Sequence, residues 1–91
     1  MNEQSFRPAN ELTFNTVQDD VARLQKLLNG QQIKTLHMDL QNVTYCDSAG
    51  LALLIEAKRL CKQHDTSLEL KGVTKAISAL AEFCGVAAIL A

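Results

Sequence analysis

The stretch Asp47-Ser48-Ala49-Gly50 carries the side chains of this sequence that are best suited to chemistry. It stands directly before an apolar run, Leu51–Ile55. Beside a carboxylate, the Ser48 hydroxyl could act as a nucleophile or accept a phosphoryl group. The same residues could instead begin a helix, because a side-chain oxygen there accepts hydrogen bonds from free backbone N–H groups and stabilises the helix by about 1 kcal/mol. The two interpretations differ in whether further reactive groups converge on Ser48.

A serine hydrolase would need more than Ser48. Its elbow pattern is G-x-S-x-G, and Cys46 stands where the first glycine belongs. A triad also needs a histidine as base. His37 lies in the middle of an expected strand, and His64 lies at the far end of the expected helix, about 24 Å away at 1.5 Å per residue. The pattern therefore favours a helix start, and catalysis is not expected.

The three cysteines are Cys46, Cys61 and Cys84, and their spacings are wide. No C-x-x-C pair occurs, so neither a zinc site nor a redox pair is indicated. We expect no metal and no other cofactor. Reduced thiols that act as small apolar side chains fit a cytosolic protein.

Length and composition indicate a single domain, residues 1–91. Hydrophobic residues make up 47% of the chain without any tryptophan, so the core should be aliphatic. The formal net charge is -1, which gives no overall field for nucleic acid, and nucleic-acid binding is not expected. The N-terminus resembles no signal peptide. The longest fully apolar run, Leu51–Ile55, is far shorter than the ~20 residues that cross a bilayer, so no direct membrane insertion is expected.

Short strands and one helix are predicted in the first part of the chain. The first eight or so residues could form an edge strand or a loose end. Residues 11–15 alternate, with Leu12 and Phe14 on one face, which is typical of a short strand. The helix that follows should begin at Thr16 as N-cap and stop at Gly30. Its apolar positions have helical spacing and are Val17, Val21, Leu24, Leu27 and Leu28.

The rest of the chain predicts alternating strands and helices. Residues 34–40 form the clearest strand, with Leu36, Met38 and Leu40 on one face. A short link leads to a helix from Ser48 to about His64. A strand at 67–72 and a helix at 74–84 follow. The inward residues of that last helix should be Ile77, Leu80, Ala81 and Cys84; Gly85 should end it, and residues 86–91 should form a final helical turn or a short strand. This order favours a mainly parallel sheet with helices packed on it.

The helix from Ser48 is more apolar than packing on a sheet requires. At 100° per residue, its core face centres on Ala57 and carries Leu53, Leu54, Leu60 and Cys61. Leu51 and Ile55 fall off this face, beside Lys58, Arg59 and Lys62. Ile55 is either a lone exposed apolar residue or part of an apolar strip with a basic rim, which describes a protein-binding surface. Gly50, inside the first turn, indicates that another backbone or molecule comes close.

The segment LHMDLQNVTYCDSAGLALL resembles the signature of STAS domains, the sulfate transporter and anti-sigma-factor-antagonist family. In these domains a strand ends in Asp-Leu, and Asp-Ser-Ser-Gly-Leu then opens a helix. LELKGV and ALAEFCGVAAIL also resemble the family's next strand and last helix. The resemblance covers residues 33–91 well, with the signature region at 33–64, and the N-terminal third in outline. It implies a STAS-like α/β fold, with a mixed, mainly parallel sheet of four to five strands.

Within the family, the GLALL run and the short chain are most similar to the small STAS subunit of the Mla phospholipid-transport complex. The resemblance implies a noncatalytic, cytoplasmic subunit that binds the ATPase of an ABC transporter and thereby reaches the inner membrane, where the complex maintains lipid asymmetry. The implied contact residues are Asp39, Asp47, Ser48, Gly50, Leu51 and Ile55, with Lys58, Arg59 and Lys62 as the basic rim.

One departure from the family pattern concerns phosphorylation. Anti-sigma-factor antagonists are phosphorylated on the hydroxyl residue immediately before the glycine, and Ala49 stands there. Ser48 is the remaining candidate acceptor, and we expect it to cap the helix and face a partner without carrying a regulatory phosphate. The alternative function is an anti-sigma-factor antagonist that binds an anti-sigma kinase. Weak self-association of the free protein is left open by the sequence.

Overall fold

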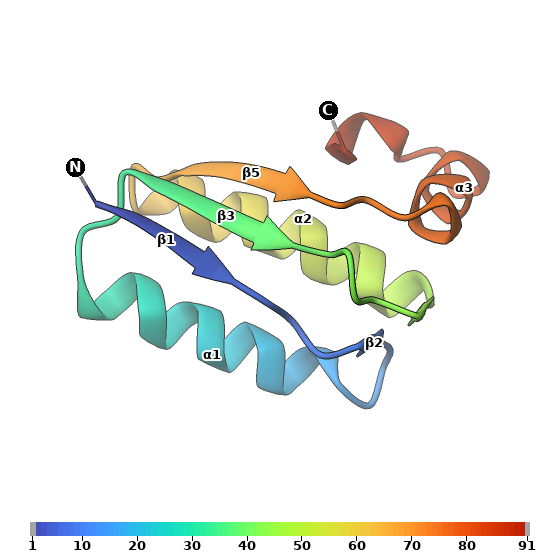
Figure 1. The fold of residues 1–91 in the computed structure, drawn as a ribbon, viewed down its shortest axis with the longest axis horizontal. Coiled ribbons are helices and arrows are strands. Elements are labelled where there is room, and N and C mark those ends of the chain that lie inside the picture. Colours follow the sequence, from blue (N-terminus) through green and yellow to red (C-terminus); the bar gives the residue numbers. More distant parts are fainter. Residues whose placement is uncertain (1, 91) are drawn as a thin grey trace.

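The structure, a computed structural model, describes residues 2–90. Figure 1 shows an α/β fold in which strands and helices largely alternate along the chain. The elements are β1 (Glu3–Phe6), β2 (Glu11–Leu12), α1 (Val17–Gly30), β3 (Thr35–Asp39), β4 (Tyr45–Cys46), α2 (Ser48–Gln63), β5 (Ser67–Lys71), α3 (Lys75–Phe83) and a short 3₁₀ helix, η1 (Ala87–Leu90). Of the two alternatives for the residues after Gly85, the structure has the helical turn, η1, and not a short strand; Ala91 lies outside the described residues.

The five strands divide between two parallel sheets. β3 is the central strand of a three-stranded sheet with the order β1-β3-β5, and β2 pairs with β4 in a separate two-stranded sheet. The expected mainly parallel arrangement is therefore confirmed. The predicted link before α2 contains β4, a strand of two residues that the sequence analysis did not identify.

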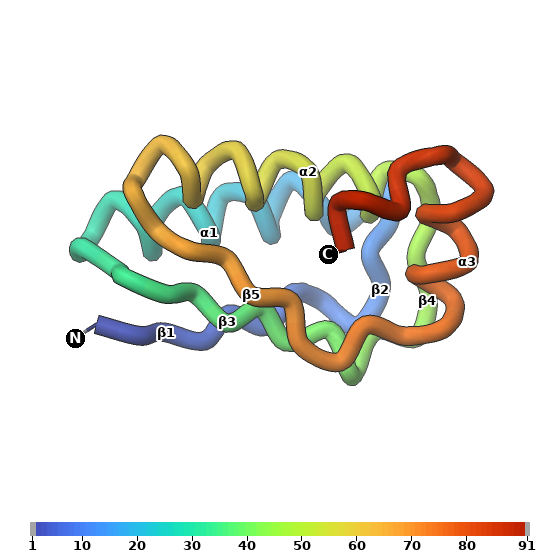
Figure 2. The backbone as a smooth tube through the Cα atoms, turned by 90° about the horizontal axis from the view of Figure 1, so that it is seen from above, coloured from blue at the N-terminus to red at the C-terminus, as the bar shows by residue number. Residues whose placement is uncertain are grey.

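Both long helices cover the same face of the three-stranded sheet (Figure 2). Leu36, Met38 and Leu40 point toward the helices and are fully buried, as the alternation predicted. The intervening residues of β3 are half-buried and lie on the open face of the sheet, where charged side chains of β1 and β5 flank them. The core is aliphatic, and Phe6 is its one aromatic member among residues 2–90.

The strand predicted at residues 11–15 ends at Leu12. Thr13 and Thr16 close a turn directly after it: the Thr16 hydroxyl donates to the Glu11 carbonyl at 2.7 Å and accepts from the Thr13 N–H at 2.9 Å. The turn leaves Phe14 80% exposed while Leu12 is buried, so the prediction that the two share one face of a strand is wrong. It also occupies the Thr16 side chain, which makes no capping hydrogen bond to α1.

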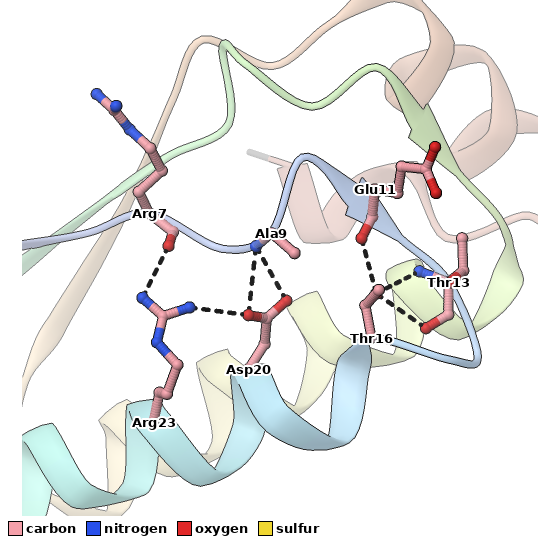
Figure 3. Close-up of polar contacts among 7 residues, drawn as sticks. All are labelled: Arg7, Ala9, Glu11, Thr13, Thr16, Asp20 and Arg23. Atoms are coloured by element: carbon pink, nitrogen blue, oxygen red, sulfur yellow. Dashed lines mark hydrogen bonds and ion pairs between the residues drawn. The ribbon is translucent and has the colours of Figure 1, made fainter.

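Asp20 anchors the segment before β2 to α1. Its side chain is buried, and its two carboxylate oxygens accept from the Ala9 N–H at 3.3 and 3.2 Å. Arg23 donates to the same carboxylate at 3.0 Å and to the Arg7 carbonyl at 3.1 Å (Figure 3). Because a buried charge is costly unless it is paired and hydrogen-bonded, this arrangement keeps a carboxylate stable inside the fold.

α3 closes the end of the molecule near β4. Ile77 and Ala81 are buried as predicted, and Leu80 is half-buried against the core. Cys84 is exposed, so its predicted inward position is wrong. The helix ends at Phe83, one residue before Cys84, and Gly85 then turns the chain with a φ of 75°. Within residues 2–90, no helix is both long and apolar enough to cross a membrane.

Candidate functional site

Asp47, rather than Ser48, caps α2. The Asp47 backbone is extended, and its carboxylate accepts hydrogen bonds from the N–H groups of Ala49 at 2.9 Å and Gly50 at 3.3 Å. The charge also lies at the positive end of the helix dipole. The prediction that the Ser48 side chain forms the cap is therefore wrong. Ser48 is the first helical residue, and its hydroxyl is exposed without a hydrogen-bond partner within residues 2–90.

The same carboxylate holds the loop between β2 and α1. The Phe14 N–H donates to Asp47 Oδ2 at 3.4 Å, and the Asp47 N–H donates to the Leu12 carbonyl at 3.0 Å. Asp47 thereby fixes the start of α2 and the position of the Phe14 backbone together. The capping role of Asp47 could be predicted from local sequence. Its contact with Phe14 could not, because the two residues lie far apart in the chain.

Gly50 lies where α2 meets β2. A Cβ atom at this position would approach Cys46 Sγ to 2.5 Å, and both Leu12 Cβ and the Leu12 carbonyl oxygen to 2.7 Å. These distances are shorter than real Cβ contacts. The prediction that another backbone comes close to Gly50 is confirmed, and the glycine serves internal packing.

One row of outward-facing residues runs along α2. Its members are spaced at helical intervals and all are exposed: Ser48, Ala52, Ile55, Arg59 and Lys62, here called the α2 stripe. Ile55 is 45% exposed and lies in the middle of the row, as the helix phase predicted. Leu53 and Leu54 are buried on the opposite side. Small and apolar residues occupy the first half of the stripe, and basic residues occupy the second.

Leu51 does not belong to this surface. It is 3% exposed and packs into the hydrophobic core. The resemblance to the STAS family implied a contact role for it, and its angle on the helix lies away from Ala57. The neighbouring elements nevertheless cover it, so its side chain is removed from any partner that approaches the exposed face of α2.

The basic half of the stripe, together with the neighbouring Glu56 and Lys58, carries one ion pair and further positive charge. Arg59 Nε donates to Glu56 Oε1 at 2.7 Å, and this hydrogen bond lowers the pKa of the Glu56 carboxyl. Lys58 is half-buried beside them, and Lys62 is exposed in the last turn. Neither lysine has an ion-pair partner within the described part of the chain. Beyond Arg59–Glu56, this end of α2 therefore presents positive charge to solvent.

Three exposed aromatic side chains lie on segments near the start of α2: Phe14 in the turn after β2, Tyr45 on β4 and Phe83 on α3, here called the aromatic end. Figure 2 shows β2, β4 and α3 at that end of the molecule, and α3 contacts α2 and β4. Phe83 is 91% exposed. No sequence pattern predicted this group. Composition alone could have suggested it: because the core is built from aliphatic residues, most of the few aromatic side chains have no place in the interior.

Asp39 lies apart from the α2 stripe. It is at the end of β3 and alternates with the buried Met38 and Leu40, so it faces the open side of the sheet. Its carboxylate pairs with Arg7 at 3.2 Å and accepts from the Gln41 N–H at 3.0 Å. The structure thus separates Asp39 from the other predicted contact residues, because α2 covers the opposite face of that sheet.

The histidines and cysteines form no reactive centre with Ser48. His37 Nε2 lies 2.8 Å from Glu3 Oε1 and its Nδ1 lies 3.5 Å from Glu69 Oε1, on the open face of the sheet. Burial raises the pKa of the Cys46 thiol, and it raises the pKa of Cys61 to about 11, which keeps both thiols protonated near neutral pH. No group of three potential metal-ligating side chains occurs within residues 2–90.

The comparisons with known proteins agree with this architecture. A model of the STAS family described as "Mlab, STAS domain" matches residues 9–91. Anti-sigma-B factor antagonists of Staphylococcus epidermidis and Staphylococcus aureus strain NCTC 8325 are 36% and 35% identical over 50 and 52 residues. Each alignment spans about half of both chains, 55% and 57% of this chain and 46% and 48% of the relative.

Two solved structures have the same fold. The anti-sigma factor antagonist SpoIIAA in its unphosphorylated form matches with a TM-score of 0.77 and 17% identity, over 97% of this chain and 77% of that one. A sulfate transporter family protein from Wolinella succinogenes matches with a TM-score of 0.76 and 20% identity, over 98% and 71%. From the extent of the family match, together with this architecture, it follows that the chain belongs to the STAS domain family.

Proposed function

We propose that this chain is a noncatalytic STAS domain that binds a partner protein with the α2 stripe and the aromatic end. The observation that carries the proposal is the exposure of Ile55 in the middle of an otherwise small or basic row. Apolar side chains at the centre of a surface, with charge at its border, are typical of protein interfaces. Ser48 begins α2 and His64 follows its last residue, while His37 lies against Glu3 on the open face of the sheet, and this separation supports binding rather than catalysis.

The two halves of the stripe have different roles in this proposal. Ala52 and Ile55 give a shallow apolar contact into which the partner's own apolar residues pack. Lys62, with Lys58 beside the stripe, attracts an acidic surface and accelerates association, an effect that salt screens. Phe14 and Phe83 enlarge the apolar area, because aromatic side chains bury much surface at little conformational cost.

The first candidate partner is an anti-sigma factor. The curated relatives that align at 35–36% identity are named anti-sigma-B factor antagonists, which supports this class. In this version of the proposal the chain binds the anti-sigma factor without control by phosphate, because Ala49 lacks an acceptor oxygen at the family's usual position. Intact-mass analysis of protein from the native host should accordingly find no stoichiometric phosphate on Ser48.

The second candidate partner is the ATPase subunit of a phospholipid ABC transporter. Two observations favour it: the matching family model carries the description Mlab, and a binding site without a phosphorylatable residue before Gly50 suits a permanent subunit. In that complex the chain would stabilise or regulate the ATPase and lie at the inner membrane through its partner.

Affinity capture from the native host, followed by titration of the purified chain against the captured protein, tests both candidates. Ile55→Asp should weaken the complex by at least about tenfold, because docking would desolvate a charge at the centre of the interface. Ala22→Asp on the exposed surface of α1 is the matched control and should bind normally. Leu54→Asp should instead unfold the domain, since it buries an unpaired carboxylate. If the Ile55→Asp and Ala22→Asp variants are both folded and bind equally well, the partner does not bind to the α2 stripe.

A further inference from the structure

The α2 stripe is nearly symmetric about Ile55. Ser48 lies seven residues before it, and Lys62 lies seven residues after it. Ala52 lies three residues before it, and Arg59 lies four residues after it. These spacings keep all five side chains on one line along the helix, as in the seam of a coiled coil. Because all five are exposed, the stripe can pack against another helix along its whole length.

Side-chain length differs between the two halves of the stripe. Ser48 and Ala52 in the first half are short, whereas Arg59 and Lys62 in the second half are long. When two copies of α2 cross antiparallel at Ile55, the short half of each copy lies against the long half of the other. The two surfaces then fill each other, because a long side chain occupies the space that a short one leaves.

Charge favours the same antiparallel arrangement. In a parallel pair, Lys62 of one copy would lie beside Lys62 of the other, and the like charges would repel each other. In the antiparallel pair, the basic half lies against the start of the other α2, where Asp47 holds a half-buried carboxylate. The positive end of each helix dipole also lies beside the negative end of the other. The stripe therefore complements a second copy of itself.

The aromatic end extends this complementarity. Phe14 is held beside the start of α2, because its N–H donates to Asp47 Oδ2 at 3.4 Å. In the antiparallel pair, this end of one copy lies next to Arg59 and Lys62 of the other. Cationic side chains are attracted to the faces of aromatic rings, arginine more often than lysine. The exposed aromatic side chains and the basic half of the stripe would thus meet in one contact.

We propose that two copies of this chain associate through the α2 stripe, with the helices antiparallel and Ile55 on the two-fold axis. One helix face about 24 Å long covers less than the roughly 800 Å² that each partner buries in a stable complex, so the dimer is weak and reversible. Its regulatory consequence rests on the proposed function: because the dimer covers Ile55, self-association competes with the partner protein for the same surface.

Sedimentation velocity of the purified chain alone, between about 10 μM and 1 mM, tests the dimer. The average mass should rise toward that of two chains as the concentration increases. Ile55→Asp places two carboxylates on the two-fold axis and should keep the chain monomeric over the same range. Ala22→Asp, on the exposed surface of α1, is the matched control and should associate like the wild type.

A change at Ser48 tests the antiparallel arrangement. Ser48→Glu adds a carboxylate opposite Lys62 of the other copy and should strengthen the dimer about threefold, within the range of an exposed ion pair. In a parallel pair the same change would place two carboxylates side by side and weaken the dimer. Adding Lys62→Glu to Ser48→Glu should remove the gain. Gln18→Glu adds the same charge on the exposed surface of α1 and should leave the dimer unchanged.

Three results would overturn the proposal. These are a chain that stays monomeric up to about 1 mM, equal association of the Ile55→Asp and Ala22→Asp variants, and a weaker dimer of the Ser48→Glu variant. If Ile55→Asp proves unfolded by circular dichroism, the response to Ser48→Glu decides, because that change lies at an exposed position.

The assay on the chain alone separates this inference from the proposed function. A chain that stays monomeric, but loses its partner protein through Ile55→Asp, would overturn the dimer and leave the proposed function intact. A chain that dimerises through Ile55 and binds its captured partner equally well with and without Ile55→Asp would support the dimer and contradict the proposed function.

Discussion

Replacing Gly50 by alanine should destabilise the domain, although alanine is the better helix former. On an open helix surface the change would stabilise by roughly 0.5–1 kcal/mol. At Gly50, however, the new methyl group would lie 2.7 Å from both Leu12 Cβ and the Leu12 carbonyl oxygen. These atoms belong to or adjoin the backbone, so they cannot swing aside. Overpacking of this kind costs about 1–3 kcal/mol, and the net loss should therefore be roughly 1–2 kcal/mol.

Thermal unfolding followed by circular dichroism measures this loss. A domain of this size should melt roughly 5–15 °C lower for such a change. Gly30→Ala is the matched control: nothing lies within 4 Å of its added methyl group, so its melting temperature should be unchanged or slightly higher. If Gly50→Ala melts at or above the wild-type temperature, then α2 does not press on β2 as closely as the structure indicates, and the reasoning about the start of α2 is refuted.

Asp47→Ala should lower stability by about 1–2 kcal/mol in urea unfolding, because it removes the cap of α2. The stability that Glu3 provides depends on pH. The hydrogen bond from His37 lowers the pKa of the Glu3 carboxyl below the ordinary 4.5, so this stabilisation is present above that pH and is lost as the pH falls. Glu3→Gln should accordingly lose less stability than the wild type between about pH 5 and 3, with a smaller difference in high salt. A thiol reagent at neutral pH should modify Cys84 quickly and Cys61 only after unfolding, because Cys84 is exposed and burial raises the pKa of Cys61 to about 11; equal rates would contradict the packing of α2.

The spacing of apolar residues predicted the elements that bury one continuous apolar face. The alternation of Leu36, Met38 and Leu40 identified β3, and the helical spacing of Leu53, Leu54 and Ala57 identified the buried face of α2. These patterns suffice because each buries a continuous apolar face against neighbouring elements. The same helical spacing of α2 also predicted that Ile55, the centre of the candidate site, is exposed.

The errors arose where contacts distant in sequence, or a local turn, override periodicity. Phe14 fits the alternation of a strand, but hydrogen bonds between Thr13 and Thr16 end that strand after Leu12. Asp47 takes the capping role expected of Ser48, since its carboxylate reaches two helix N–H groups and the loop at Phe14 as well. Leu51 lies off the predicted face of α2, yet neighbouring elements cover it.

β4 could not be predicted by periodicity because it has two residues. Its strand character arises from pairing with β2, another strand of two residues, in a register that joins Glu11 to Tyr45. Too few positions exist for an alternating pattern to appear in either segment. The aromatic end depends on this pairing, which brings Tyr45 beside the β2 segment from a distant part of the chain.

The parallel topology also determines how this chain must fold. Each strand pair joins segments more than thirty residues apart, and within residues 2–90 no two strands pair through a hairpin. A long loop must therefore close before any sheet hydrogen bond forms, which makes folding slower than in a helical domain of equal size. α1 lies in the connection between β1 and β3, and α2 lies in the connection between β3 and β5. A variant that delays either helix should thus also delay the pairing of the strands on both sides of it.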